Sequence, residues 1–214
     1  MKPECNGPRP GSLRSFVPRM LCTLSAVALI FSALFAIATP SGAAPANGAA
    51  RSAHVYLFRG LMNVFSLGMD EIATELGKLG IPASVYNHLS WSSVADSAAA
   101  DYKSGKVKTI ILVGHSAGAT AVTSAAERIG QLGVPVKLAI GLDPLSRVTA
   151  SGRVGRYLNF YVGNGAGQQV AKGSKFNGSL QNVNVQGMSD VGHFNIDKNR
   201  ALQARVIREI RSSL

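Results

Sequence analysis

The chain of 214 residues has only two cysteines, Cys5 and Cys22, and both lie close to its N-terminus. The rest of the chain has no thiol, which excludes a disulfide framework and a thiolate metal site there. Acidic residues are also scarce, because 11 Asp and Glu stand against 22 Lys and Arg, for a net charge of +11. The sequence contains no internal repeat.

Long apolar runs are scarce too, with one exception near the N-terminus. Four basic residues precede an uncharged stretch over residues 20–50, and its apolar centre covers residues 21–38. Small residues and prolines follow, so the pattern predicts a signal peptide or an N-terminal membrane anchor over 1–43 and a linker over 44–53. The apolar centre leaves both open, because it is longer than the usual 7 to about 15 residues of a cleaved signal and just long enough to span a bilayer. We expect an exported chain, periplasmic or secreted, either free or anchored by this segment.

Positive charge remains without that segment. Residues 51–214 have 18 basic and 10 acidic residues, a net charge of +8. The basic residues are scattered and do not form a stripe interleaved with aromatics, which speaks against a nucleic-acid partner. A solvated surface accounts for this charge, and attraction to anionic envelope surfaces or acidic substrates is the alternative. The sequence leaves the oligomeric state open.

Strand and helix patterns alternate from His54 to the C-terminus. The predicted strands cover residues 55–58, 83–86, 109–113, 136–142, 157–162 and 183–186, and the predicted helices cover 69–78, 93–103, 119–129 and 198–212. Apolar strands separated by helices indicate a mostly parallel sheet covered on both faces, with ligands held at the carboxyl ends of the strands. We therefore expect an α/β three-layer sandwich of about six strands, as one domain over residues 54–214. The glycine-rich stretch at 163–167 is expected to be a loop, since no helix pattern follows it.

Residues 114–118 read Gly-His-Ser-Ala-Gly and lie between a predicted strand and a predicted helix. This order spells strand, sharp turn and helix, with Ser116 at the apex. Such a turn holds its serine in a strained backbone conformation and packs the helix against the strand, which requires glycine two residues to either side. The pattern predicts that Ser116 is a nucleophile.

A serine hydroxyl needs a neighbouring general base and a group that orients that base. His193 follows the last predicted strand and precedes the final helix, which places it at the carboxyl edge of the sheet and after the serine in the chain. The other histidines fit less well: His54 begins the first strand, His88 follows the second strand, and His115 lies inside the turn. A surface or capping role is the alternative for any single histidine.

Asp143 is the candidate for the orienting acid. It directly follows the predicted strand 136–142, which gives the chain order Ser, Asp, His. The alternative is that it only begins a turn, which Asp-Pro favours by itself. Asp190 and Asp197 lie within four residues of His193 and are expected to be local turn or helix-cap residues.

Acyl transfer also needs two backbone N–H groups directed at the developing oxyanion. The amide of Ala117, directly after the serine, is expected to supply one. The turn after the first strand should supply the other, with Leu61 as the most suitable amide and Gly60 and Met62 as its neighbours. The loops at 62–67, 89–94 and 145–156 are expected to shape the pocket.

Taken together, residues 58–61, 114–118, 141–144 and 192–194 resemble the α/β-hydrolase superfamily, over nearly all of the stretch 54–214. An acid after the strand that follows the turn's helix resembles the lipase-type arrangement. Two features depart from the family: Arg59-Gly60 stands where His-Gly is usual, and the initial antiparallel hairpin is missing. No insertion after the sixth strand is long enough for a large lid, so the resemblance implies an open site like those of minimal esterases and cutinase-like enzymes.

The resemblance implies a serine hydrolase that cleaves carboxylic ester or thioester bonds through an acyl-enzyme. Ser116, Asp143 and His193 would form the catalytic triad, and the amides of Ala117 and Leu61 would form the oxyanion hole. The expected partner is a small-molecule or lipid-like acyl substrate, with no metal and no organic cofactor; esterase, lipase and thioesterase activities stay open. The alternative is a non-catalytic binding or scaffold protein of the cell envelope that keeps the fold. A binder of nucleic acid or another anionic polymer is a third, weaker reading.

Overall fold

The computed structural model describes residues 48, 52–61 and 66–214 of the chain. All of them belong to one compact unit, residues 41–214. The predicted signal peptide or anchor, and most of the predicted linker, lie outside the described residues. In the ranges that are described, no helix has both the length and the hydropathy needed to cross a membrane.

A six-stranded sheet forms the centre of this unit, and all of its neighbouring strands are parallel. Its strands in chain order are β1 (Ala53–Arg59), β2 (Ala83–Asn87), β3 (Thr109–His115), β4 (Val136–Leu142), β6 (Val154–Tyr161) and β8 (Ser179–Asn184). Their order across the sheet is β2-β1-β3-β4-β6-β8. The predicted α/β class with about six strands is confirmed.

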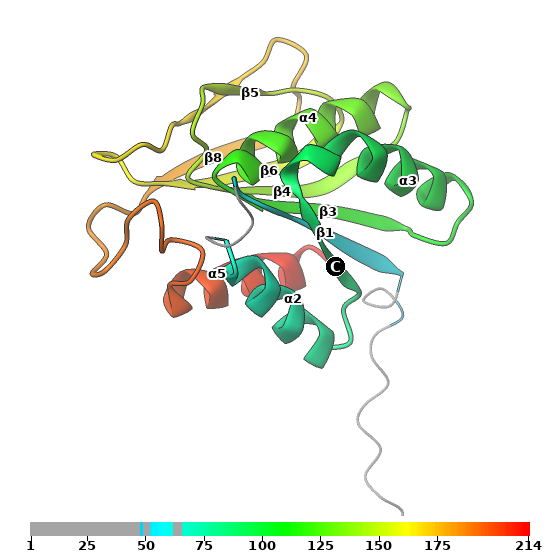
Figure 1. Ribbon diagram of the computed structural model, residues 1–214. Helices are drawn as coiled ribbons and strands as arrows, with labels where there is room; N and C mark the ends of the chain where they lie inside the picture. Colours follow the sequence, from blue (N-terminus) through cyan, green and yellow to red (C-terminus); the bar gives the residue numbers. More distant parts are fainter. Residues whose placement is uncertain (1–47, 49–51, 62–65) are drawn as a thin grey trace, which may run out of the picture. The chain divides into compact units, whose positions relative to one another are not determined.

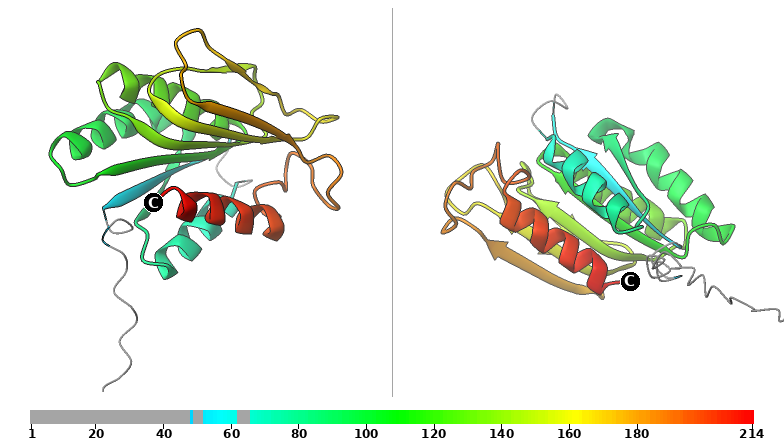
Figure 2. Two further views of the ribbon diagram at one scale, coloured as in Figure 1. Left: turned by 180° about the vertical axis from the view of Figure 1, so that it is seen from behind. Right: turned by 90° about the horizontal axis from the view of Figure 1, so that it is seen from below.

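Helices cover both faces of the sheet (Figures 1 and 2). α3 (Trp91–Lys103) and α4 (Ala117–Gln131) lie on one face, while α2 (Gly68–Lys78) and α5 (Arg200–Ser212) lie on the other. A short 3-10 helix, η1 (His88–Ser90), precedes α3. The result is an α/β sandwich of three layers, helix, sheet and helix.

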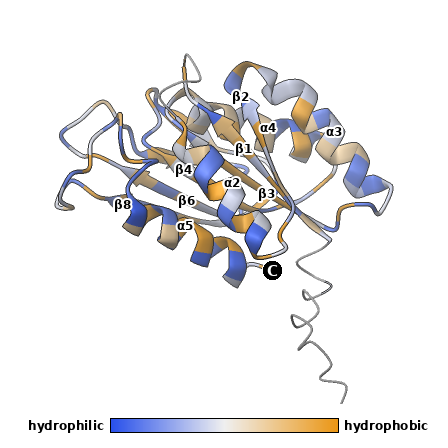
Figure 3. Cartoon of the chain, turned by 60° about the horizontal axis from the view of Figure 1, so that its bottom comes forward, coloured by the Kyte–Doolittle hydropathy of each residue, from blue (hydrophilic) through white to orange (hydrophobic). Residues whose placement is uncertain are grey.

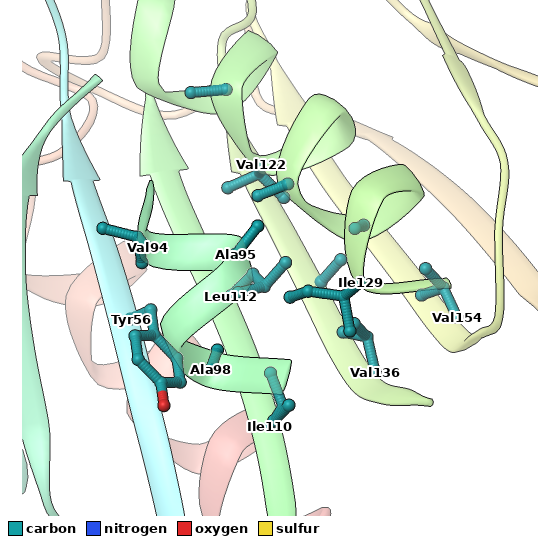
Figure 4. Packing of buried hydrophobic residues seen from close by; sticks show 14 of the residues in the cluster. Tyr56, Val94, Ala95, Ala98, Ile110, Leu112, Val122, Ile129, Val136 and Val154 are labelled. Atoms are coloured by element: carbon teal, nitrogen blue, oxygen red, sulfur yellow. The ribbon is translucent and has the colours of Figure 1, made fainter. Parts of the chain in front are cut away.

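In the central strands β1 and β3, alternating side chains enter two separate cores. In β1, Tyr56 and Phe58 pack towards α3 and α4, whereas Val55 and Leu57 pack towards α2 and α5. Figure 4 shows the first of these cores, where α3 and α4 lie against β1, β3 and β4. The alternation follows from the two-residue period of a strand whose two faces are both buried.

The helices on the second face each bury one stripe. α5 buries Leu202, Val206 and Ile210, which are four residues apart and therefore share a side of the helix. Hydrophilic and hydrophobic residues accordingly alternate along α2 and α5 in Figure 3.

Two features differ from the predicted elements. β8 covers Ser179–Asn184 and not 183–186, because its alternately exposed residues form no continuous apolar run at the sheet edge. A second, two-stranded parallel sheet of β5 (Val148–Ala150) and β7 (Val170–Lys172) was not predicted, since strands of three residues leave almost no periodic signal. The predicted loop at 163–167 lies between β6 and β7 and contains neither helix nor strand.

Candidate active site

Three side chains that are far apart in the sequence form one hydrogen-bonded line at the carboxyl ends of the strands. Ser116 directly follows β3, Asp143 directly follows β4, and His193 lies between β8 and α5. The Ser116 Oγ atom lies 3.0 Å from His193 Nε2, and His193 Nδ1 lies 2.7 Å from Asp143 Oδ2. The parallel sheet brings these residues together because its strands all end at the same edge.

The backbone of Ser116 has the strained conformation that the sharp turn requires. Its φ is 60° and its ψ is −123°, in a region that residues with side chains rarely occupy. A Cβ atom at Gly114 would collide with the Gly118 carbonyl, and one at Gly118 would collide with the Phe58 carbonyl. The backbone N–H of Ser116 donates to the Leu142 carbonyl at 2.9 Å, which ties this turn to the end of β4.

The carboxylate of Asp143 is fully buried and held from several sides. Its Oδ2 accepts from His193 Nδ1, and its Oδ1 accepts from the backbone N–H of Val162 at 2.7 Å. The backbone φ of Asp143 is 54°, and its backbone N–H donates to the Phe160 carbonyl at 2.7 Å. Both carboxylate oxygens therefore have partners, so the buried charge is compensated in one fixed orientation.

Gly167 contributes to this environment by having no side chain. A Cβ atom at this position would overlap the Asp143 carboxylate. The glycine-rich loop, to which the sequence pattern gave no role, thus passes directly over the acid. A glycine count alone does not reveal such a close approach.

The two expected oxyanion donors belong to segments that adjoin Ser116. Ala117 is the first residue of α4, and Leu61 lies in the turn after β1. This turn comes close to the serine, since a Cβ atom at Gly60 would lie 2.9 Å from the Cβ of Ser116. Among the described residues, no acceptor pairs with the backbone N–H of Ala117 or Leu61. The N–H of Gly60, in contrast, donates to Ser66 Oγ at 2.8 Å, and Met62 lies outside the described residues.

An apolar cavity of about 330 Å³ opens beside the serine. Its lining residues are Leu61, Ser66, His115, Ser116, Leu145, Ala166, His193 and Phe194. None of them is Asp, Glu, Lys or Arg, and three large apolar side chains on its rim, Leu61, Leu145 and Phe194, are exposed. The cavity suits an uncharged, apolar group.

A second cavity, of about 320 Å³, lies across Leu145 from the first. It is lined by parts of η1, α3 and α4, among them Leu89, Trp91 and Ala117. Two larger hollows, of about 460 and 560 Å³, lie elsewhere and contain none of the three aligned side chains. The predicted pocket loops at 89–94 and 145–156 thus contribute to the cavities beside Ser116, as does Ser66 from the loop at 62–67.

The other histidines and acids occupy different environments. His54 lies 3.0 Å from Ser84 on the neighbouring strand, and burial lowers its pKa. Asp190 is exposed in a turn, as predicted. Asp197 also lies in a turn, but its side chain is fully buried, accepts from the Gly68 N–H at 3.0 Å, and does not cap α5, whose N-cap is Asn199. Burial raises the pKa of Asp197 to about 6.

His115 has a place that the sequence pattern did not predict. Its ring is buried, with one nitrogen 2.7 Å from Ser66 Oγ and the other 2.8 Å from the His193 carbonyl. From the sequence, only its position inside the turn was evident, and no residue spacing indicates these partners.

Arg59, which stands where the resemblance noted in the sequence leads one to expect histidine, points to α2. Its side chain forms a two-point ion pair with Asp70, with its Nε donating at 2.8 Å. In the part of the chain that the structure describes, no group of three or more His, Cys, Asp or Glu side chains is arranged to hold a metal ion.

Comparisons with known proteins add little to this geometry. No family model and no curated protein matches the chain. One solved structure with a similar fold comes from Xanthomonas campestris pv. campestris and is provisionally described as a hydrolase of the alpha/beta superfamily. The match has 14% sequence identity and a TM-score of 0.46, and covers 76% of this chain and 99% of that one. Similarity at this level leaves the activity of the present chain to be inferred from its own residues.

Proposed function

We propose that this chain is an exported serine hydrolase that cleaves carboxylic ester or thioester bonds through an acyl-enzyme. One observation carries the proposal: Ser116, His193 and Asp143 are hydrogen-bonded in line at the mouth of an apolar cavity. The order and contacts are those in which a base activates a hydroxyl and an acid orients the base.

The first half of the reaction forms the acyl-enzyme. His193 Nε2 takes the proton of the Ser116 hydroxyl while Oγ attacks the substrate carbonyl carbon. The amides of Ala117 and Leu61 stabilise the oxyanion that develops, and each such donor is worth about 10² to 10³ in rate. The imidazolium then gives its proton to the departing alcohol or thiol, and the carbonyl re-forms as the acyl ester of Ser116.

Water completes the cycle. His193 takes a proton from the water as it attacks the acyl carbon, and returns it to Ser116 Oγ when the carboxylic acid leaves. Asp143 holds the imidazole with its proton on Nδ1 and stabilises the charged ring throughout. These steps need protein side chains and water, and the proposal includes no metal and no organic cofactor.

The cavity supports an apolar acyl group as the substrate class. A charged group would lose its hydration there without a counter-charge, because the described residues that line the cavity include no Asp, Glu, Lys or Arg. Its volume of about 330 Å³ is at the lower end of the range typical of small-molecule sites. This favours short and medium acyl chains over long ones.

The alternative, a non-catalytic envelope protein with the same fold, predicts that the three side chains are out of register. Hydrogen bonds of 3.0 and 2.7 Å along the line favour the hydrolase instead. Export, proposed from the N-terminal sequence, does not bear on this choice.

A panel of p-nitrophenyl esters of increasing chain length, assayed with the wild type and with Ser116→Ala, tests the proposal. We expect hydrolysis by the wild type that favours butyrate to octanoate over palmitate, and its loss in the variant. Equal and flat activity in both proteins would refute it. A panel of acyl thioesters in the same assay decides between the two bond types.

A further inference from the structure

The ring of His115 lies between the two loops that flank the candidate nucleophile. Residue 115 ends β3 directly before Ser116, and its side chain is 2% exposed. One ring nitrogen, Nδ1, lies 2.7 Å from Ser66 Oγ, and the other, Nε2, lies 2.8 Å from the backbone carbonyl of His193. Both nitrogens therefore have a partner, one in each loop.

The partners determine which ring nitrogen carries the proton. A carbonyl oxygen only accepts, so Nε2 must donate to His193. Burial lowers the pKa of His115 to about 4, so the ring is neutral at pH 7 and Nδ1 is an acceptor. The Ser66 hydroxyl must then donate to Nδ1, and its oxygen accepts the Gly60 N–H at 2.8 Å.

The resulting chain of hydrogen bonds runs in one direction. It begins at the Gly60 N–H, passes through the Ser66 hydroxyl and the His115 ring, and ends on the His193 carbonyl. One end therefore holds the turn that presents the Leu61 amide, and the other holds the backbone of the base. His115, the residue directly before Ser116, connects these two ends.

We infer that His115 is a positioning residue that aligns the oxyanion turn and the base loop on the nucleophile. The inference rests on the proposed function, since it assigns His115 to the same reaction. The hydrogen bond to Ser66 affects the stabilisation of the oxyanion, because it holds the turn of Leu61. The hydrogen bond to the His193 carbonyl affects proton transfer to the leaving group, because it holds the base. A buried histidine without a positioning role would need only one hydrogen-bond partner for each ring nitrogen, and any two polar groups of the core could serve.

Ser66, His115 and Asp197 do not form a second triad, although all three are buried. The Ser66 hydroxyl is already occupied on both sides, by Gly60 and by His115. The Asp197 Oδ1 atom is 3.8 Å from His115 Nδ1, beyond hydrogen-bond distance, and Asp197 Oδ2 accepts from Gly68 at the start of α2. The role of this group is therefore to hold loops in place.

Two substitutions of the same residue separate the two sides of the chain. His115→Asn keeps a side-chain acceptor near the place of Nδ1 and removes the bond to His193. His115→Gln keeps a donor near the place of Nε2 and removes the bond to Ser66. Ser66→Ala is a small change that leaves the His115 ring in place. Like His115→Gln, it removes the hydrogen bond between residues 66 and 115.

The assay compares the p-nitrophenyl ester and the ethyl ester of one acyl chain. An ethoxide leaving group needs a proton from His193, whereas p-nitrophenolate leaves without one. We expect His115→Asn to lose about tenfold more kcat/KM on the ethyl ester than on the p-nitrophenyl ester, because kcat/KM reports the step that releases the alcohol and general acid catalysis contributes about 10² to 10⁴. His115→Gln and Ser66→Ala should lose kcat equally on both esters with KM little changed, because the oxyanion is common to both reactions.

Wild-type kcat in all three variants, or the same ratio of the two esters in all three, would overturn the inference. If neither His115 variant folds, the kcat of Ser66→Ala decides: an unchanged value overturns the inference, and an equal loss on both esters supports it. A wild type without Ser116-dependent hydrolysis overturns the proposed function and this inference with it. An active wild type with unaffected variants overturns the inference alone.

Discussion

His193 Nδ1 lies 2.7 Å from Asp143 Oδ2, although the two residues are 50 positions apart in the chain. The Asp143 side chain is fully buried and that of His193 is 12% exposed. A carboxylate this deep is held in one orientation by its second oxygen, which accepts from Val162. The imidazole of His193 is thereby fixed with its other nitrogen towards Ser116.

Asp143→Asn should therefore lower kcat by about 10³- to 10⁴-fold, because the amide no longer favours the imidazole tautomer with its proton on Nδ1. KM should change little, since Asp143 does not line the cavity. Steady-state kinetics on one p-nitrophenyl ester measures both values. Asp190→Asn is the matched control, because Asp190 has a similar φ of 56° but is exposed in a turn. Equal kcat in the two variants would contradict the role of Asp143.

Gly167→Ala should lower kcat/KM by about 10²-fold, because its Cβ atom would displace the Asp143 carboxylate and misalign the base. Gly165→Ala in the same loop is the control, since its Cβ atom would approach Val162 alone, no closer than 3.3 Å. We expect activity close to that of the wild type for Gly165→Ala. Wild-type activity in Gly167→Ala would show that the acid does not need its observed position.

Leu145→Ala should change the preference for acyl chain length. Leu145 lines both the cavity beside Ser116 and the second cavity, so we expect its truncation to enlarge the space available to an acyl chain. We expect kcat/KM for the p-nitrophenyl decanoate to rise relative to the butyrate by about tenfold, the order of one or two methylene groups in an apolar pocket. Leu79→Ala, a leucine at the end of α2 with the same exposure of 43%, should keep the wild-type ratio. A wild-type ratio in Leu145→Ala would exclude Leu145 as a wall of the acyl site.

Asp197 should make stability depend on pH in the direction opposite to an ordinary ion-paired acid. Burial raises its pKa from 3.8 to about 6, so between these values the folded state holds a proton that the unfolded state has lost. The stabilisation that this carboxyl group contributes is fully present below pH 3.8 and is lost as the pH rises through 6. We expect the free energy of unfolding of the wild type, relative to Asp197→Asn, to fall by about 2 kcal/mol from pH 4 to pH 7.

Urea unfolding at several pH values measures that difference. Asp190→Asn, which removes an exposed carboxylate, should show no such trend relative to the wild type. His115 titrates in all of these proteins, so its own opposite contribution largely cancels in the comparison. A difference between the wild type and Asp197→Asn that stays constant or grows with pH would contradict the raised pKa.

Much of the fold could be predicted because it depends on long, regular signals. β4 was predicted at its observed bounds, and β1 and β3 nearly so, because most of their residues are buried and form apolar runs. The rule that parallel strands end at one edge then placed Ser116, Asp143 and His193 together. Their roles in catalysis stay a prediction until activity is measured.

The sequence could not reveal contacts that depend on the tertiary path of the loops. The links from His115 to Ser66 and from Ser66 to Gly60 join residues 49 and six positions apart, with no periodic pattern between them. The burial of Asp197 follows from the packing of α2 against the turn before α5, which no local propensity encodes. The same holds for Gly167, whose approach to Asp143 depends on how the loop after β6 returns over the sheet.

The most direct test of the account is the reaction of the folded protein with a fluorophosphonate, followed by mass spectrometry of its peptides. This reagent labels a serine only when a neighbouring base and an oxyanion site activate it. We expect one adduct on Ser116 in the wild type, none in Ser116→Ala, and much slower labelling in His193→Ala. A folded wild type that remains unlabelled at Ser116 would contradict the proposed hydrolase.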